Sequence, residues 1–190
     1  MKENDILELF YESGALLRGH FLLTSGKHSD RYVQCAQVLK HAAATEKLVA
    51  ALAGKLTQGY DLVIGPAMGG VIVAYEMGRQ LGVPSIFTER EQGVMTLRRG
   101  FEIPRDSRVL VVEDVITTGG SVQEVVELVQ AAGGNAVEAA VLVDRSRGDH
   151  VVSIPVTSLL ELSIDTFEAE KCPLCKHSRP VKPGSRKING

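Results

Sequence analysis

The sequence contains no tryptophan, only three cysteines, and nearly balanced charges that leave a net charge of −2 at pH 7. An odd number of cysteines cannot form a fully paired disulfide framework, and so few of them indicate a reducing compartment. The near-neutral charge offers no basic surface for nucleic acid. No apolar run approaches the roughly 20 residues that span a bilayer, and the polar start Met1 to Asp5 lacks the apolar core of a signal peptide. These absences predict a globular cytoplasmic protein with neither nucleic-acid nor membrane partners.

The middle of the chain has a regular alternation of predicted strands and helices. The full chain has 190 residues, 44% of them hydrophobic, which is enough to bury the core of one domain. Strands are expected at 61–64, 85–88, 109–112 and 136–143, and helices at 42–56, 71–81 and 122–132. Such alternation predicts an α/β fold with a central, mainly parallel sheet flanked by helices, whose ligands bind beyond the carboxyl ends of the strands. We expect a single domain over residues 1–190, with the α/β core at 41–150 and peripheral segments at 1–40 and 151–190 covering the site.

The most specific local signal is the stretch from Val109 to Ala132. A short β-branched run is followed by two carboxylates, Glu113 and Asp114, then by a turn rich in threonine and glycine, and then by a helical pattern. A strand that passes through a glycine-rich turn into a helix presents backbone N–H groups and a partial positive charge to one point, which suits a phosphate. The adjacent carboxylates suit the hydroxyls of a sugar, directly or through Mg²⁺. The stretch has neither the Gly-Lys-Ser/Thr of a Walker loop nor Rossmann glycine spacing, and it predicts a phosphorylated, polyhydroxy ligand.

Two further segments are expected beside this motif. Residues 64–70 follow a buried strand with small residues, so that a ligand can approach the backbone closely. Residues 88–100 form a long charged segment between two predicted strands, typical of a mobile lid whose arginines clamp phosphoryl oxygens. A solvated hairpin is the open alternative for Arg98 and Arg99.

The acidic motif resembles the phosphoribosyl-pyrophosphate motif of the type I phosphoribosyltransferases. The resemblance implies that Glu113 and Asp114 address the ribose hydroxyls, that the segment after them grips the 5′-phosphate, and that residues 64–70 form the pyrophosphate loop. It also matches Arg90 to the basic start of the family's catalytic loop. The implied phosphoribosyl-pyrophosphate site consists of Glu113, Asp114, Val115, Ile116, Thr117, Thr118, Gly119, Gly120, Ser121, Met68, Gly69 and Gly70. The chain departs from the family pattern at Gly69, where a lysine is common, and in a short catalytic loop without the usual lysine-plus-histidine pattern.

Other residues resemble the orotate-specific members of that family. Residues 21–32 are similar to the hood that covers the base, although Thr24 stands where some members carry lysine, and the pair Asp144-Arg145 matches the site of the orotate carboxylate. The resemblance implies orotate binding by Thr117, Arg145, Ser25 and Tyr32. It implies transfer of a 5-phosphoribosyl group from phosphoribosyl pyrophosphate to orotate in pyrimidine (UMP) biosynthesis, with Mg²⁺ as cofactor and a homodimer that shares its catalytic loops.

Because orotate is already an anionic nucleophile, the main catalytic residue is expected to be Asp114, which faces positive charge developing on the ribose, with Glu113 and Arg90 in support. Two other readings stay open. A purine phosphoribosyltransferase would share the acidic motif without needing the hood or Arg145. A regulator of this fold that binds RNA would need a basic face, which the near-neutral composition does not provide.

Cys172 and Cys175 have half the spacing of a zinc site, with His177 nearby. A second cysteine pair is missing because Cys35 is the only other cysteine. Further ligands would be Cys35, another histidine or a partner subunit. The sequence favours a C-terminal turn with reduced cysteines over a metal site.

Overall fold

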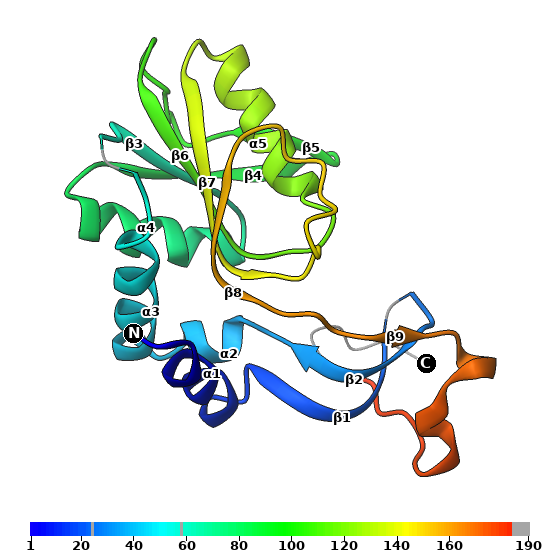
Figure 1. Ribbon diagram of the computed structural model, residues 1–190. Coiled ribbons are helices and arrows are strands. Elements are labelled where there is room, and N and C mark those ends of the chain that lie inside the picture. The colour runs from blue at the N-terminus through cyan, green and yellow to red at the C-terminus, as the bar shows by residue number, and fades with distance from the viewer. Residues whose placement is uncertain (24, 58, 184–190) are drawn as a thin grey trace. The chain divides into compact units, whose positions relative to one another are not determined.

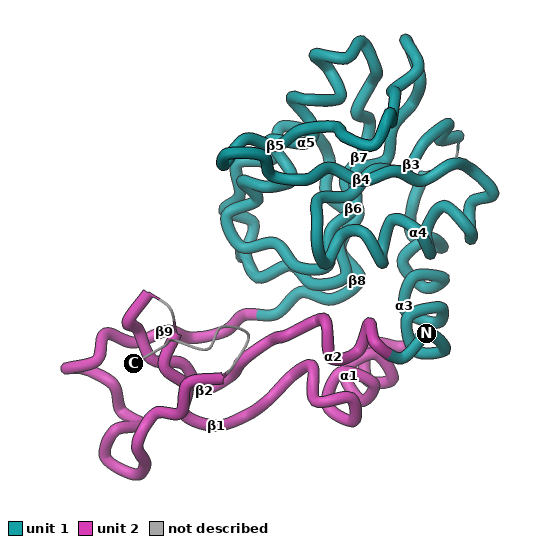
Figure 2. The backbone as a smooth tube through the Cα atoms, turned by 180° about the vertical axis from the view of Figure 1, so that it is seen from behind, with its two compact units in different colours: residues 1, 41–162 teal, residues 2–40, 163–190 magenta. Residues whose placement is uncertain are grey.

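The computed structural model describes residues 1–23, 25–57 and 59–183, which form two compact units (Figures 1 and 2). The larger unit comprises Met1 and residues 41–162 and holds the central sheet. The smaller comprises residues 2–40 together with the described residues from Ser163 onward. None of the helices within these described residues has the length and apolar character needed to cross a membrane.

The larger unit is built on a six-stranded sheet in the order β5-β4-β3-β6-β7-β8 (Figure 1). Every neighbouring pair is parallel except β4 and β5. The strands are β3 (Leu62–Pro66), β4 (Ser85–Glu91), β5 (Val94–Leu97), β6 (Arg108–Ile116), β7 (Asn135–Asp144) and β8 (Val156–Glu161). The predicted α/β fold with a mainly parallel sheet is confirmed.

Helices cover both faces of this sheet because its central strands are apolar on both sides. The helix α5 (Gly120–Ala131) packs its valines against Leu62, Ile64, Val109 and Val111. The helices α3 (Ala42–Ala53) and α4 (Gly69–Leu81) contact each other. They lie on the face to which the alternate residues of the strands, such as the buried Val63 and Leu110, point.

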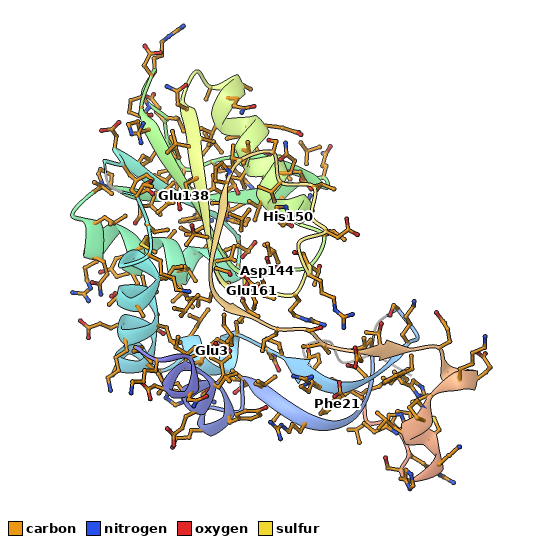
Figure 3. All side chains as sticks on the ribbon, viewed as in Figure 1. Glu3, Phe21, Glu138, Asp144, His150 and Glu161 are labelled. Atoms are coloured by element: carbon orange, nitrogen blue, oxygen red, sulfur yellow. The ribbon has the colours of Figure 1, made fainter. Side chains whose placement is uncertain are left out.

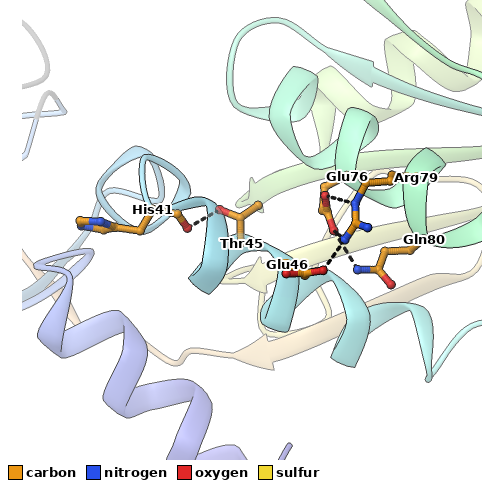
Figure 4. Close-up of polar contacts among 6 residues, drawn as sticks. All are labelled: His41, Thr45, Glu46, Glu76, Arg79 and Gln80. Carbon is orange, nitrogen blue, oxygen red and sulfur yellow. Dashed lines mark hydrogen bonds and ion pairs between the residues drawn. The ribbon is translucent and has the colours of Figure 1, made fainter.

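Arg79 ties α4 to α3 through a polar cluster (Figure 4). Its guanidinium donates to Glu76 at 2.7 and 2.9 Å and to Glu46 of α3 at 2.6 Å. Gln80 donates to Glu76 Oε1 at 2.8 Å, and the hydrogen bonds from Arg79 hold the pKa of the Glu76 carboxyl below its usual range. The cluster fixes the helix that starts directly at the predicted pyrophosphate loop.

Two segments of the larger unit differ from the sequence expectation. The strand β8 lies beyond the predicted end of the core at residue 150, yet it pairs in parallel with β7, so the core unit reaches Leu162. Its mixture of polar and apolar residues fits an edge strand and hides the apolar run on which the prediction depended. The predicted lid forms a β-hairpin as far as Leu97, because Gln92 and Gly93 adopt positive φ angles of 50° and 88° that suit a tight turn.

The smaller unit contains a three-stranded antiparallel sheet in the order β1-β2-β9. Its strands are β1 (Leu16–Leu22), β2 (His28–Val33) and β9 (Thr166–Phe167). Its helices are α1 (Glu3–Glu12) and α2 (Ala36–Leu39), followed by 3₁₀ turns at Ala169–Lys171 and Pro173–Lys176. Ile6 and Phe10 anchor α1 as buried side chains. The C-terminal segment joins β1 through a parallel bridge between Phe21 and Val181.

Candidate active site

The two predicted acidic residues lie near the carboxyl end of β6, the central strand between β3 and β7. Both side chains are half-buried. The backbone N–H of Asp114 donates to Glu113 Oε1 at 3.1 Å, and the N–H of Val115 donates to Asp114 Oδ1 at 2.8 Å. These local bonds hold the carboxylates at the sheet edge where ligands of α/β folds bind.

The electrostatics of this pair favour a bound positive or hydrogen-donating partner. Burial raises the pKa of Glu113 well above its usual range, and the neighbouring charge of Asp114 adds to that effect. Burial also raises the pKa of Asp114. Two adjacent, poorly solvated carboxylates resist carrying two negative charges, so hydroxyl donors or a cation that meets them gains a strong interaction.

The loop before α4 lies directly against these carboxylates. A Cβ atom built on Gly69 would lie closer than 3.0 Å to the carboxylate of Asp114, and one on Gly70 would lie 3.2 Å from Glu113 Oε1. The structure therefore brings the predicted pyrophosphate loop and the acidic pair together within the larger unit. It also explains the departure at Gly69, because a lysine side chain there would displace Asp114.

The segment from Thr117 to Ser121, which the sequence predicts to be a phosphate cradle, connects β6 to α5. It lines a pocket of about 90 Å³ together with Glu113, Val115 and Ile116. Gly119 caps α5 with a φ of 80°, and a Cβ there would lie 2.6 Å from Val152 Cγ2, so both the backbone and the packing require glycine. The amides of the first turn of α5 have no partner four residues earlier and point to the pocket end, which suits an anion.

Arg145 lies beside the phosphate cradle at the end of the neighbouring strand. Ile116 of β6 pairs with Asp144 of β7, and the backbone N–H of Arg145 donates to the carbonyl of Ile116 at 2.9 Å. Asp144 marks the carboxyl end of β7, opposite Glu138 near the strand's start (Figure 3). Thr117 and Arg145 thus follow adjacent parallel strands at one edge of the sheet, as the sequence predicts.

Arg90 is placed on the β4–β5 hairpin rather than in an irregular loop. Its guanidinium donates to both carboxylate oxygens of Glu124 in α5, at 2.7 and 2.8 Å, and to the carbonyl of Gly93 at 2.8 Å. Glu124 was not predicted from the sequence, although its place three residues after the cradle puts it on the first turns of α5. Arg99 is similarly paired with Glu89 at 2.7 Å.

The remaining predicted residues belong to the smaller unit. Tyr32 lies in β2, opposite Leu17, with its ring 5.9 Å from that of Phe21. Ser25 lies in the turn before β2, and Thr24 falls outside the described residues. The role of Ser25 and Tyr32 in binding a base stays a prediction.

Cys172 and Cys175 also lie in this unit, beside two histidines that were not predicted from the sequence. These four side chains, His20, His28, Cys172 and Cys175, offer ligand atoms within 4.8 Å of one another. No sequence pattern connects the two histidines with the two cysteines, because His20 and Cys172 are separated by 152 residues along the chain.

Comparison of the sequence with known proteins finds one matching domain family and several similar proteins. The sequence profile of the phosphoribosyl transferase domain family matches residues 36–174. The orotate phosphoribosyltransferase of Desulforamulus reducens is 54% identical over 99% of this chain and 100% of its own length. That of Heliobacterium modesticaldum is 54% identical over 98% of this chain and 100% of its own length.

Solved structures show the same likeness at lower identity. The orotate phosphoribosyltransferase of Mycobacterium tuberculosis H37Rv, in complex with Fe(III) dicitrate, is 27% identical with a TM-score of 0.69, covering 84% of this chain and 97% of its own. The Aeropyrum pernix orotate phosphoribosyltransferase is 27% identical with a TM-score of 0.67, covering 83% of this chain and 93% of its own.

Proposed function

Because this chain belongs to the orotate phosphoribosyltransferases of the phosphoribosyltransferase family, it transfers the 5-phosphoribosyl group of phosphoribosyl pyrophosphate to orotate, and we propose which residues do so. The reaction yields orotidine 5′-monophosphate and pyrophosphate in pyrimidine biosynthesis. The observation that carries the assignment of residues is the meeting of three segments at the carboxyl edge of the sheet: the acidic pair, the glycines before α4, and the cradle before α5.

In this proposal the cradle from Thr117 to Ser121 binds the 5′-phosphate. The pocket at the start of α5 supports this role, since it collects backbone N–H groups and the positive end of the helix dipole. Glu113 and Asp114 bind the ribose 2′- and 3′-hydroxyls as acceptors. The backbone of Met68, Gly69 and Gly70 faces the pyrophosphate, and the two glycines support this role because they carry no side chain toward the acidic pair.

Mg²⁺ is the proposed cofactor, brought with phosphoribosyl pyrophosphate. The site fits a hard divalent cation, since Glu113 and Asp114 are adjacent oxygen donors whose charged forms burial disfavours. When bound, the ion supplies charge neutralisation for the leaving pyrophosphate. The chain's own contribution is to hold the ribose between the two carboxylates and the α5 cradle.

Catalysis then follows from charge placement. As the bond from C1′ to pyrophosphate breaks, positive charge develops on the ribose, and Asp114 stabilises it more strongly than it stabilises the ground state. Because orotate is already an anion, its attacking nitrogen needs no strong general base to remove a proton. Arg90 assists at the pyrophosphate after exchanging Glu124 for phosphate oxygens. Both members of that ion pair are substantially exposed, at 43% and 39%, so the exchange costs about 1 kcal/mol or less.

The base is bound at the end of β7. Arg145 donates to the carboxylate of orotate, and Thr117 lies between the base and the 5′-phosphate, while a role of Ser25 and Tyr32 at the base stays the expectation that the family resemblance implies. The position of Arg145 beside Ile116 supports the first two assignments. A cation at this edge favours an anionic base over the neutral purines.

The function is tested by supplying purified enzyme with phosphoribosyl pyrophosphate and Mg²⁺ and offering orotate, adenine, hypoxanthine or uracil as the acceptor. Pyrophosphate release is expected with orotate alone. Release with adenine or hypoxanthine, and none with orotate, would contradict the substrate assignment while leaving the phosphoribosyl site intact.

A two-fold homodimer is the proposed working unit. The side chains of Met68, Ile72 and Tyr75 are exposed at 86%, 43% and 69%. Ile72 and Tyr75 lie on one face of α4, and Met68, the residue directly before its start, continues their spacing of three and four residues. An exposed apolar stripe of this kind is typical of an interface, and a second copy of the chain would cover it.

A mixing experiment tests whether the dimer shares its sites. Arg90→Ala and Asp114→Asn are each expected to be nearly inactive. After random exchange about half of the dimers are hybrids, and one of the two sites in each hybrid combines an intact hairpin with an intact acidic pair. Activity should therefore return to about a quarter of the wild-type level. The matched control mixes Asp114→Asn with a chain that carries both Arg90→Ala and Asp114→Asn, because no hybrid of these two chains contains an intact acidic pair. Confirmed exchange without regained activity would show that Arg90 serves its own chain.

A further inference from the structure

Four potential metal ligands converge in the smaller unit, and none of them has a role in the proposed mechanism. The Nε2 atom of His20 lies 2.9 Å from Nδ1 of His28 and 3.5 Å from Sγ of Cys172. The Sγ atom of Cys175 lies 3.3 Å from Nδ1 of His28 and 3.8 Å from Nε2 of His20. All four ligand atoms lie within 4.8 Å of one another.

The nitrogen–sulfur separations are close to the edges of a tetrahedron around a single zinc ion. Zinc bonds of about 2.0–2.1 Å to nitrogen and about 2.3 Å to sulfur place two nitrogens about 3.3 Å apart and a nitrogen and a sulfur about 3.6 Å apart. The three nitrogen–sulfur separations of 3.3, 3.5 and 3.8 Å bracket that value. A shift of a few tenths of an ångström in one histidine ring would bring the nitrogen pair to it.

The ring of His20 is already oriented as a ligand. Its Nδ1 atom lies 2.9 Å from the backbone carbonyl of Ser178, and a carbonyl can only accept, so the proton is on Nδ1. The Nε2 lone pair therefore faces the cluster. A metal-binding histidine that donates its other N–H to a carbonyl is the usual arrangement that fixes the tautomer. His20, His28 and Cys172 are buried, while Cys175 is open to solvent and provides a route of entry.

We propose that His20, His28, Cys172 and Cys175 bind one structural Zn²⁺. Two thiolates and two imidazoles form the soft and borderline donor set that selects zinc, and they exclude the oxygen-seeking Mg²⁺ and Ca²⁺. Four protein ligands leave no open position, so the site is structural and not catalytic. A disulfide between Cys172 and Cys175 would not explain the arrangement, because it gives the two histidine nitrogens no metal ion to bind.

The site joins the two ends of the chain. His20 lies near the end of β1 and His28 begins β2, whereas Cys172 directly precedes the second 3₁₀ turn and Cys175 lies within it. Other interactions also connect these segments: β2 pairs with β9, Val181 donates to the carbonyl of His20 at 2.8 Å, Ser29 Oγ donates to the carbonyl of Asp165 at 2.8 Å, and Lys27 forms an ion pair with Glu168 at 2.9 Å. A small unit with a three-stranded sheet buries little apolar surface, so a metal supplies much of its stability.

Measurement of the zinc content of the purified protein tests the proposal. Protein purified under reducing conditions, without a metal-affinity tag and without chelator, is expected to contain one zinc per chain by elemental analysis. The double substitution Cys172→Ser and Cys175→Ser should lower this to less than about a tenth of an ion per chain. The control is Cys35→Ser, which removes the third cysteine and should keep the full zinc content. Wild-type protein without zinc that also fails to bind added Zn²⁺ would overturn the proposal.

A second measurement remains decisive if the double variant does not fold. Wild-type protein exchanged with Co²⁺ should show the visible absorption of a tetrahedral cobalt site together with thiolate-to-cobalt charge transfer. His28→Ala should weaken both bands, whereas His177→Ala should leave them unchanged. Absence of these bands in folded wild-type protein, or their full retention in His28→Ala, would contradict the assigned ligand set. Chelation of the zinc should also expose the β1–β2 hairpin to proteolysis while residues 41–162 stay protected.

Discussion

Replacing Asp114 by asparagine is expected to lower kcat by about 10²- to 10³-fold while changing the affinity for phosphoribosyl pyrophosphate by much less. Asparagine keeps the size of the side chain and an oxygen that can accept the hydrogen bond from the N–H of Val115, at 2.8 Å in the structure. It removes only the negative charge that faces the ribose. Because that charge matters most when positive charge develops at C1′, its loss weakens the transition state more than the ground state.

Steady-state kinetics at saturating concentrations of both substrates checks this expectation. The matched control is Glu127→Gln, which removes a carboxylate from the exposed surface of α5, where Glu127 accepts a bond from Gln123. Its kcat should stay within about twofold of the wild type, since exposed charges away from the site have small effects. A wild-type kcat in Asp114→Asn would show that this carboxylate only shapes the backbone after β6.

The burial of the acidic pair explains why one charge has so large an effect. The same desolvation that raises the pKa of Glu113 and of Asp114 strengthens their interaction with any positive charge that replaces water. In the empty protein the pair is unfavourable when both groups are ionised. Binding of the substrate and the cation relieves that repulsion. The unfavourable electrostatic free energy of the empty pair therefore adds to the strength of binding and to the stabilisation of positive charge during the reaction.

The sequence predicted those parts of the site whose signals are local. The run Val109 to Val112, the adjacent carboxylates and the Thr-Gly turn lie within a dozen residues, and each has a direct physical meaning for strand, charge or phosphate. Their assembly with Gly69 and Arg145 also followed, because parallel strands bring their carboxyl ends to one edge. The register of Ile116 with Asp144 bears this out.

What the sequence did not predict depends on partners distant along the chain. The cluster of potential metal ligands joins His20 to Cys172, and no local pattern marks a histidine in one hairpin as the neighbour of a cysteine 152 residues away. The pairing of Arg90 with Glu124 depends on how the β4–β5 hairpin lies against α5, which charge pattern alone does not determine. The edge strand β8 was missed because its half-polar surface lacks the apolar run of a central strand.

Arg145→Ala is expected to raise the KM for orotate by about 10- to 150-fold while leaving the KM for phosphoribosyl pyrophosphate within about threefold. The range corresponds to the loss of one charge-assisted hydrogen bond, worth about 1.5–3 kcal/mol. Arg145 is held at the carboxyl edge of the sheet by its backbone bond to the carbonyl of Ile116, at 2.9 Å, which the substitution leaves in place. The loss should therefore concern the guanidinium and not the path of the chain.

Two comparisons separate recognition of the carboxylate from a general effect of positive charge. Arg105→Ala removes an exposed cation that precedes β6, at the opposite edge of the sheet, and should change neither KM. Arg145→Lys keeps the charge but loses the planar fork, so it should recover part of the affinity for orotate and not all of it. The discrimination between orotate and uracil, which lacks the carboxylate, should shrink in Arg145→Ala by the same factor as the rise in KM. An unchanged discrimination would assign the orotate carboxylate to a different cation, because the guanidinium of Arg145 contributes to substrate choice only through that group.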